Sequence, residues 1–479
     1  MDGGPRHRPD LEGLAARDSA GRLGLTVGQA VIWLILAGGL VVAFTIRPAQ
    51  TLHVVVLGAQ LAFLVFAAWR IMLVIASSGP IPTARLPELW PRYTILAALH
   101  DEAEVASQLI ERLSAIDYPE GRLEALLLLE AHDRPTIEAV AAVPLPHWMS
   151  VLIVPPGSPR TKPRALNHGL ARASGELITV YDAEDQPDPL QLREAAARFR
   201  ADPTHRLVCL QAPLRIRRLQ PTPGASRFLD RQFAIEYAAL FEVVLPGLAR
   251  IGMPFPLGGT SNHFRVDALR AVGGWDAFNV TEDADLGFRL WRHGWRLGVI
   301  GRPTWETPPH GVACWLPQRT RWLKGYMQTW GVHTRRLDGL GWRGLLALPL
   351  TLGAGLVAAA MHAVTLAWIA ATLMISTTAG LPALTPRFAL GVLLTGVVAA
   401  WIQGAVGARR AKVRWGATDM MASPAYWALL SLAFVHAAWR LIVDPHAWDK
   451  TAHRRDVAEA AAGSSPMTTD ALDAGREAA

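Results

Sequence analysis

Residues 177–185 have the sequence LITVYDAED, in which five strand-forming residues are followed at once by Asp182, Glu184 and Asp185. A short apolar run bounded by polar residues predicts a buried strand with the carboxylates at its carboxyl end. Carboxylate oxygens are the ligands that Mg²⁺ and Mn²⁺ prefer. The stretch therefore predicts a strand that presents a metal site, or else the acidic start of a helix near Leu190.

The pattern of an apolar run with a polar end recurs across residues 80–310. Strands alternating with helices predict an α/β fold with a mostly parallel sheet, in which ligands bind at the carboxyl ends of the strands. Acidic groups recur at those ends, in residues 100–102 (HDE) and 130–133 (EAHD). The other strands are predicted at 93–99, 125–129, 151–154 and 207–211, and helices at 104–116, 164–173 and 190–199.

Long apolar runs flank this segment on both sides. The chain has 479 residues, of which 51% are hydrophobic and only 18% charged, a balance typical of membrane proteins. A helix needs about 20 apolar residues to span a bilayer core. We expect a disordered cytosolic tail at 1–24, two transmembrane helices in 25–78, C-terminal transmembrane or interfacial helices in 344–443 and a disordered tail at 451–479.

The basic run at 409–414 (RRAKVR) follows an apolar run directly, which favours a cytosolic loop there. The apolar run 344–386 is too long for one straight crossing, so we expect a bent or interfacial start near Pro349 and then one crossing. The last run, 420–443, carries Arg440 and can either cross or lie in the interface. Aromatic and basic residues in 311–340 predict an amphipathic helix at the membrane surface.

The overall charge indicates which kinds of ligand the protein can bind, and the number of cysteines indicates whether disulfides are expected. The formal net charge is +7, which suits anionic membrane lipids and a phosphate-bearing substrate, and no feature points to nucleic acid. Cys209 and Cys314 are the only cysteines, so no disulfide framework is expected.

The triplet Thr281-Glu282-Asp283 opens a predicted helix that runs to about residue 293. Thr281 can cap that helix, and the acidic residues would favour its N-terminus electrostatically. The other interpretation is that Asp283 is a general base near an acceptor hydroxyl, with Glu282 beside it. The sequence around the triplet leaves both interpretations open.

The segment Gln318-Arg319-Thr320-Arg321-Trp322 carries two guanidinium groups that can pair with a diphosphate. Trp322 offers a flat face for a sugar ring. An ordinary belt of Arg and Trp at a membrane interface would have the same composition.

Two further loops could contact a ligand. Lys162 lies just before a predicted helix, where a cation and a helix N-terminus together favour an anion. The Gly-rich segment 255–262, with Gly259 and Thr260, has small donors that could bind sugar hydroxyls. A solvated basic loop and a plain turn are the alternatives.

Taken together, these segments resemble the membrane-embedded branch of the family 2 inverting glycosyltransferases, which includes cellulose and hyaluronan synthases. The resemblance covers roughly residues 90–335 and the flanking helices. It implies a GT-A (Rossmann-like) fold inserted between transmembrane helices.

The resemblance also implies roles for particular residues. Asp182 matches the first carboxylate of the family's metal-binding Asp-x-Asp, with Glu184 or Asp185 as the second ligand. Asp283 ends the Thr-Glu-Asp motif and would be the catalytic base, with Glu282 beside it. The nucleotide-sugar contacts implied are Glu102, Glu130, Asp133, Lys162, Asp182, Arg319 and Arg321, and the acceptor contacts are Gln318, Trp322, Gly259 and Thr260.

The function implied is a metal-dependent single displacement with Mg²⁺ or Mn²⁺. A nucleotide-sugar donor, UDP-glucose or a related UDP-sugar, would extend a β-linked polysaccharide that is exported across the inner membrane, with export subunits as further partners. One alternative is the transfer of a single sugar to a lipid-linked acceptor. A second is a catalytically inactive membrane receptor for saccharides or nucleotides. The catalytic domain is expected on the cytoplasmic side.

Overall fold

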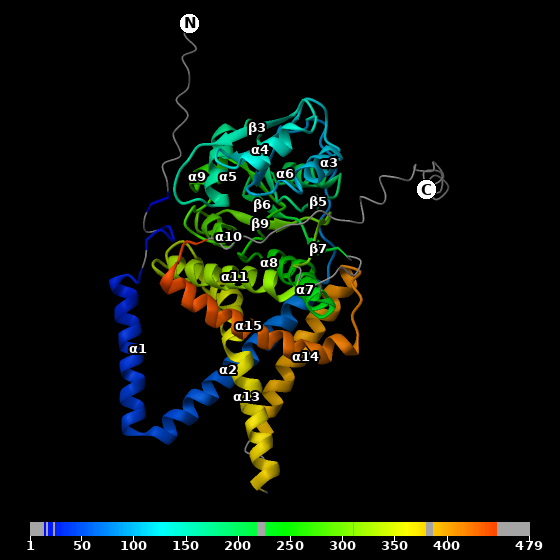
Figure 1. The fold of residues 1–479 in the computed structure, drawn as a ribbon. Coiled ribbons are helices and arrows are strands. Elements are labelled where there is room, and N and C mark those ends of the chain that lie inside the picture. Colours follow the sequence, from blue (N-terminus) through cyan, green and yellow to red (C-terminus); the bar gives the residue numbers. More distant parts are fainter. Residues whose placement is uncertain are drawn as a thin grey trace.

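An α/β domain is stacked on a group of long helices (Figure 1). The computed structural model describes residues 14–15, 18–22, 24–217, 226–309, 311–379 and 387–447. Helix α1 (Val27–Ile46) lies apart from the other long helices and joins α2 (Pro48–Ala76) at its far end (Figure 1).

The main sheet contains all five predicted strands. Its seven strands are β1 (Tyr93–Leu99), β2 (Leu123–Glu130), β3 (Met149–Val154), β4 (Leu177–Tyr181), β6 (Leu207–Gln211), β8 (Asn262–Arg265) and β9 (Arg296–Val299). They lie in the order β3-β2-β1-β4-β8-β6-β9, and β8 alone runs antiparallel to its neighbours. The prediction of a mostly parallel α/β sheet is confirmed.

The register of the sheet brings the acidic segments together. Tyr93 of β1 lies opposite Leu123 of β2 and Leu177 of β4, so the three strands end at nearly the same level. The polar residues that follow each strand therefore meet at one edge of the sheet, where ligands bind in open α/β folds.

Both faces of the central strands are covered by helices. Leu96 and Leu128 pack with Leu166 of α5 (Lys162–Arg172) on one face. Ile95 and Leu127 belong to the core of the other face, which includes buried residues of α3 (Ala106–Ser114) and α6 (Gln191–Arg200). Alternate residues thus face opposite layers, as strand geometry requires. Helix α4 (Arg134–Ala141) follows β2.

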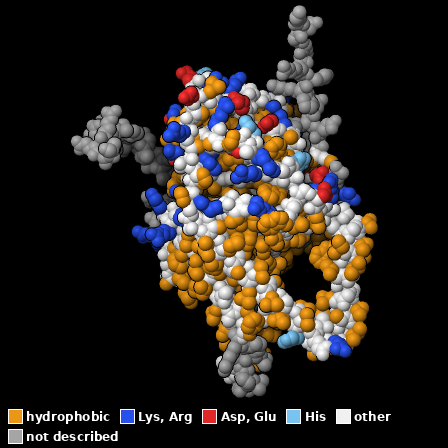
Figure 2. Space-filling view, turned by 180° about the vertical axis from the view of Figure 1, so that it is seen from behind, with side chains coloured by type: hydrophobic (Ala, Val, Ile, Leu, Met, Phe, Trp, Pro, Cys, Tyr) orange, Lys and Arg blue, Asp and Glu red, His pale blue; other side chains and the backbone are white. Residues whose placement is uncertain are grey.

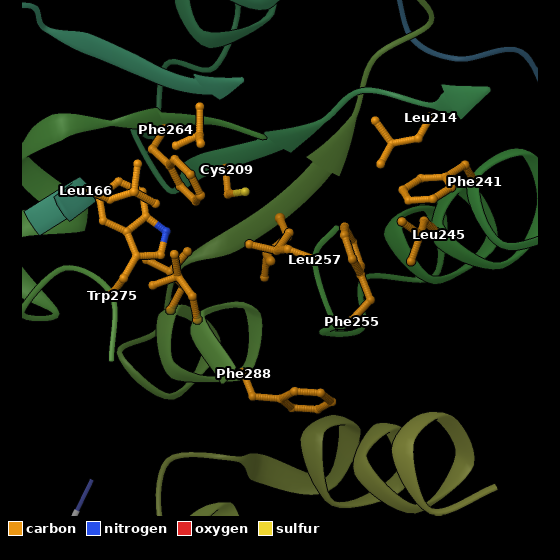
Figure 3. Packing of buried hydrophobic residues seen from close by; sticks show 14 of the residues in the cluster. Leu166, Cys209, Leu214, Phe241, Leu245, Phe255, Leu257, Phe264, Trp275 and Phe288 are labelled. Carbon is orange, nitrogen blue, oxygen red and sulfur yellow. The ribbon is translucent and has the colours of Figure 1, made fainter. Parts of the chain in front are cut away.

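The second half of the domain has an aromatic core. Phe264 of β8 meets Trp275 edge to face at 5.9 Å, close to α9 (Val266–Ala271) (Figure 3). Phe288 of α10 (Glu282–Arg292) points toward α11 (Gly311–Thr334), where its ring lies 5.6 Å from that of His333 (Figure 3). This packing fixes α10 between the sheet and α11.

A small second sheet adjoins the acidic loop after β4. It consists of β5 (Gln186–Pro187), β10 (Thr304–Glu306) and β7 (Leu214–Ile216), in that order. Because Gln186 pairs with Trp305, the end of the acidic loop is tied to the segment that precedes α11.

A helix that the sequence did not predict runs through Arg227–Arg250. It consists of α7 (Arg227–Ala239), a π-helical turn η2 (Leu240–Val244) and α8 (Leu245–Arg250). Such π-helical turns are often found at functional sites. Phe241 and Leu245 of this region pack beside Leu214 of β7 (Figure 3).

Six segments within the described residues are long and apolar enough to cross a membrane, including Arg227–Arg250, which is largely buried in the protein. The other five expose most of their apolar side chains, and these side chains cover the end of the molecule away from the sheet (Figure 2). These five are α1, α2, the continuous helix of α12 (Gly341–Leu348), η3 (Pro349–Gly353) and α13 (Ala354–Ala379), α14 (Arg387–Arg410) and α15 (Ala417–Val443).

The expectation of a wholly disordered N-terminal tail is wrong for residues 19 and 20. Ser19 and Ala20 are buried, and both donate hydrogen bonds to the carboxylate of Asp276, at 2.9 and 2.6 Å. Arg335, at the end of α11, donates to the Ser19 carbonyl. Polar contacts therefore hold this short segment on the α/β domain. The other predicted tail, 451–479, lies outside the described residues.

Candidate active site

One cavity opens at the carboxyl ends of β1, β2 and β4, and most of the predicted site residues line it. Asp133, Asp185 and Arg319 do not. The predicted residues in its wall are Glu102, Glu130, Lys162, Asp182, Glu184, Gly259, Thr260, Glu282, Asp283, Gln318, Arg321 and Trp322.

Lys162 joins three parts of this cavity. It begins α5, and its Nζ donates to the Gly259 carbonyl at 2.7 Å and also to Asp182. Burial alone would lower the pKa of Lys162, but the carboxylates of Asp182 and Glu282 outweigh burial and raise it. Lys162 is therefore a permanent cation at the start of a helix, an arrangement that binds phosphate groups.

The loop after β4 turns its acidic residues in different directions. Asp182 and Glu184 line the cavity, whereas Asp185 is fully buried behind it. The Asp185 carboxylate accepts hydrogen bonds from the Thr260 hydroxyl and the Asp182 amide. Asp185 thus supports the loop from behind, and Glu184 is the second carboxylate that faces the cavity; the choice between them as the second metal ligand stays a prediction.

The carboxylates of this wall supply the oxygen donors that a hard divalent cation prefers, although the acidic and histidine side chains whose donor atoms lie close enough together for a metal, among the described residues, are His100, Asp101 and Asp133. Glu306 of β10 lines the same cavity as Asp182 and Glu184. Burial raises the pKa of Glu306 well above its usual range, and the negative charges of Asp185 and Glu184 raise it further. Clustered carboxylates of this kind are stabilised by a cation, and oxygen donors suit Mg²⁺ or Mn²⁺.

Of the two predicted residues in the segment after β2, one lines the cavity and the other does not. Glu130 lines the cavity and pairs with Arg164 of α5 through both of its oxygens. Asp133 instead caps α4, since its carboxylate accepts from the amides of Thr136 and Asp101. Asp133 therefore acts as a cap outside the cavity wall, and its nucleotide contact stays a prediction.

The predicted base lies in the first turn of α10. Asp283 and Glu282 both line the cavity. Burial raises the pKa of Glu282 to about 7, and the neighbouring Asp283 charge adds to the effect. Burial also raises the pKa of Asp283, although the Ala284 amide, Lys162 and Arg321 oppose it. A carboxylate whose pKa is raised toward neutrality is a better proton acceptor than an exposed one.

This shift predicts a pH dependence. A base must be deprotonated, so transfer should be lost as the pH falls through the Asp283 pKa, which lies above the ordinary value for an aspartate. We therefore expect the acidic limb of kcat/KM to appear at a higher pH than for an exposed aspartate, measured by initial rates across a buffer series. A profile that stays flat down to about pH 4, the usual range of aspartate, would contradict this role.

Helix α10 is fixed against α11 by close packing and buried charge. Asp285 of α10 is fully buried, forms an ion pair with Arg289 at 2.9 Å and lies 3.1 Å from His333 of α11. A Cβ added at Gly325 would lie 2.7 Å from Thr281 Cβ, and closer still to the other Thr281 side-chain atoms. Only glycine at position 325 lets the two motifs approach this closely.

The Gly325→Ala substitution should therefore displace the Thr281-Glu282-Asp283 turn. We expect a stability loss of about 1–3 kcal/mol, the usual cost of overpacking, with a matching loss of activity. Thermal unfolding and initial rates would measure both. Gly331→Ala on the same helix is the matched control, because a Cβ there meets nothing within 4 Å. Equal behaviour of the two variants would contradict the packing argument.

The two arginines of the 318–322 segment lie on different sides of α11. Arg319 is buried, pairs with Glu236 at 2.7 Å and donates to Tyr426 at 3.0 Å. Its guanidinium lies 4.4 Å from the ring centre of Trp322. Arg319 therefore positions Trp322 and ties α11 to α15 from outside the cavity wall, and its diphosphate contact stays a prediction.

Arg321, Gln318 and Trp322 face the cavity. Arg321 makes no hydrogen bond or ion pair within the described part of the chain, and its buried Nε has no partner there. Gln318 Oε1 is likewise buried without a partner among the described residues. Unsatisfied polar atoms in a cavity wall are costly unless a ligand pairs with them, which supports a binding role for both residues.

Sequence reasoning missed one carboxylate and one wall of the cavity. Glu306 was overlooked because β10 is a three-residue strand without a clear pattern. The missed wall is largely aromatic or apolar and belongs to the α7 region and α11, which contribute Tyr237, Leu240, Phe241 and Tyr326. The mixed composition of 227–250 gave no period that would have revealed its helix.

Comparison with known proteins agrees with the fold and the motifs. The family model described as "Glycosyl transferase family group 2" matches residues 177–435, more than half of the chain. The chain belongs to this family. It is thus a family 2 glycosyltransferase, and the predictions of an enzyme of this family and of its α/β fold are confirmed.

Several curated relatives of this glycosyltransferase have names that state an activity. It is 27% identical over 268 residues to a β-monoglucosyldiacylglycerol synthase of Synechocystis, covering 54% of this chain and 53% of that protein. It is 25% identical over 236 residues to a poly-β-1,6-N-acetyl-D-glucosamine synthase of Staphylococcus epidermidis, covering 48% and 54%. The chain therefore spans about half the length of the curated relatives it matches.

Among solved structures, the mannosyltransferase PcManGT from Pyrobaculum calidifontis, in complex with GDP-Man and Mn²⁺, has a similar fold. The TM-score is 0.52 at 17% identity, over 82% of this chain and 98% of that one. This likeness supports the GT-A architecture.

Proposed function

We propose that this glycosyltransferase moves a sugar from a nucleotide donor to an acceptor hydroxyl at the membrane surface, with inversion at the anomeric carbon. The observation that carries the proposal is one cavity whose wall holds the carboxylates of the loop after β4, two positively charged side chains and a further carboxylate in the position of a base. The cations are Lys162 and Arg321, and the carboxylate is Asp283.

The reaction is a single displacement. Asp283 accepts the proton of the acceptor hydroxyl as its oxygen bonds to the anomeric carbon of the donor. The bond from that carbon to the diphosphate breaks, and the nucleoside diphosphate leaves with the electron pair. Lys162 and Arg321 stabilise the charge that develops on it. An α-linked donor gives a β-linked product.

A divalent cation, Mg²⁺ or Mn²⁺, would be held by Asp182 and Glu184. When bound, it supplies positive charge beside the diphosphate. Until a cation and donor bind, Lys162 compensates the charge of Asp182.

For the acceptor, the apolar wall favours a lipid-linked hydroxyl. Tyr237, Leu240 and Phe241 come from the helix through Arg227–Arg250, which lies between the sheet and the long apolar helices (Figure 1). A sugar acceptor attached to a lipid, or a lipid hydroxyl itself, could approach along this wall. Trp322 offers a face on which a sugar ring stacks.

A growing polysaccharide, exported as it is made, is the second candidate. The polymer synthase among the relatives favours it. Polar groups in the long helices could line an export path, but two of the three that the sequence suggests have hydrogen-bond partners within the protein. Gln403 accepts from Arg70 at 2.8 Å and His436 contacts Thr320 at 2.9 Å. His362 stacks on Trp427 at 5.5 Å, and its buried Nδ1 has no hydrogen-bond partner among the described residues.

The five exposed apolar helices support a membrane location. We place the catalytic domain on the cytoplasmic side of the membrane. The basic loop at 409–414 lies at the same end of the long helices as the catalytic domain, and basic loops are enriched on the cytoplasmic side. Arg410 of that loop donates to the Glu242 carbonyl of η2 at 2.7 Å.

The test is transfer by the full chain in isolated membranes with Mg²⁺ or Mn²⁺ and a panel of labelled nucleotide sugars, beginning with UDP-glucose. The products are divided by organic extraction and gel filtration. Label in a small extractable species supports the lipid-linked acceptor, and label in a large product supports the polysaccharide. Absence of transfer with every donor, in membranes that contain folded protein, would overturn the proposed function.

A further inference from the structure

A second cavity lies away from the catalytic one, where the catalytic domain meets two long helices. It has a volume of about 500 Å³ and is lined by Arg227 and Arg231 of α7, by Arg414, Trp415 and Gly416 between α14 and α15, and by Thr418 of α15.

The side chains that line this cavity carry positive charge, although Asp230 lies nearby in the first turn of α7. Three guanidinium groups line it, and one carboxylate, that of Asp419, is engaged by Arg231 at 2.7 and 2.5 Å. Arg227 and Arg414 are exposed, and their side chains have no hydrogen bond or ion pair within the described residues. Two cations thus face the cavity without an internal partner.

The backbone adds to this preference for an anion. The cavity lies at the start of α7, a helix of 13 residues, and beside the start of α15, a helix of 27 residues whose first turn already carries Asp419, the acceptor of the Gly416 amide. The N-terminal ends of helices carry partial positive charge. Guanidinium groups together with helix N-termini match the geometry and charge of a phosphate group.

The position of the cavity indicates where that phosphate comes from. Arg414 and Trp415 follow directly after α14 and precede α15, and both helices expose their apolar side chains. Lys and Arg side chains gather along the border between the polar and apolar halves of the molecule (Figure 2). Lipid headgroups lie at such a border, and Trp side chains are enriched there.

We propose that this cavity binds the phosphate headgroup of an anionic membrane phospholipid, which anchors the catalytic domain on the membrane through α7. Arg227 and Arg414 contact the phosphate, Arg231 is held in place by Asp419, and Trp415 lies at the level of the headgroups. None of these residues lines the catalytic cavity, so sugar transfer does not itself require the site.

The test is native mass spectrometry of the detergent-solubilised full chain with phosphatidylglycerol, phosphatidylcholine or soluble glycerol phosphate. We expect bound phosphatidylglycerol, little phosphatidylcholine and no retained glycerol phosphate. The double variant Arg227→Gln/Arg414→Gln should weaken phosphatidylglycerol binding by roughly 30-fold. Each basic residue near an anionic surface usually contributes about a fivefold gain in binding, and the variant removes two. Transfer in detergent and the melting temperature should stay unchanged.

The matched control is Arg409→Gln/Lys412→Gln, which removes two exposed charges from the same basic loop but none from the cavity wall. An equal loss of binding in this control would overturn the site in favour of diffuse attraction. Equal binding of phosphatidylcholine would overturn the preference for an anionic lipid. Occupancy by glycerol phosphate as high as by lipid would make this a site for soluble phosphate. The lipid comparisons use the unmodified chain, so they decide the matter even if the double variant does not fold.

Discussion

The Asp283→Asn variant should bind the nucleotide donor but transfer sugar about 10²–10⁴-fold more slowly, the usual contribution of a general base. The amide keeps the shape of the side chain and removes its ability to accept the acceptor proton. Initial rates with labelled donor measure kcat, and equilibrium dialysis of the nucleotide measures donor binding. A loss confined to kcat identifies the base.

The matched control for that experiment is Asp267→Asn. Asp267 also lies in the first turn of a helix, α9, and its carboxylate also accepts a neighbouring backbone amide, but it is exposed and outside the cavity. We expect this control to keep full activity. If Asp283→Asn kept the rate of the unmodified chain, the proposed base would be wrong.

Replacing each of the two arginines of α11 by glutamine should change different properties of the enzyme. Arg321→Gln should lower kcat by roughly 10²–10³-fold, as for loss of one group that stabilises transition-state charge. Its fold should be kept, because the Arg321 side chain has no hydrogen bond or ion pair among the described residues.

Arg319→Gln should instead lower stability by about 1.5–3 kcal/mol, the usual worth of hydrogen bonds to a charged group. It removes the pairs with Glu236 and Tyr426 and the contact beneath Trp322. Thermal unfolding and donor titration separate the two effects. A selective loss of donor affinity in Arg319→Gln, with an unchanged melting temperature, would restore its predicted diphosphate role.

The behaviour of the 318–322 segment also explains what sequence could and could not predict. Arg319 and Arg321 are two positions apart, so they lie on nearly opposite sides of a helix. Trp322 lies between them: Arg321 and Gln318 face the cavity, whereas Arg319 contacts Trp322 and turns to α15. The periodicity of a helix could have separated the two arginines, but the interpretation as a single motif treated them alike.

For the acidic loop after β4, helical periodicity could not predict which carboxylate faces the cavity. A loop has no fixed period, so the sequence gives no reason for Glu184 rather than Asp185 to face the cavity. The choice depends on Thr260, whose hydroxyl is brought to Asp185 by the sheet. Contacts between residues so far apart in the chain follow from the fold alone.

The strands that were predicted are short apolar runs with sharp polar ends, and three of them, β1, β4 and β6, have the predicted bounds. The overlooked strands β7, β8 and β10 have three or four residues and include polar ones, such as His263 and Glu306. Buried hydrogen bonds stabilise these polar residues; His263, for example, contacts Tyr93 at 2.7 Å. Their burial is a property of the assembled sheet.

The anomeric configuration of the product tests the central claim most directly. The full chain would be supplied with an α-linked nucleotide sugar labelled with ¹³C at the anomeric carbon, and the product examined by NMR before any further processing. A single displacement with Asp283 as base requires a β-linked product, formed far more slowly by Asp283→Asn. An α-linked product would contradict the mechanism, because it requires retention and a second nucleophile.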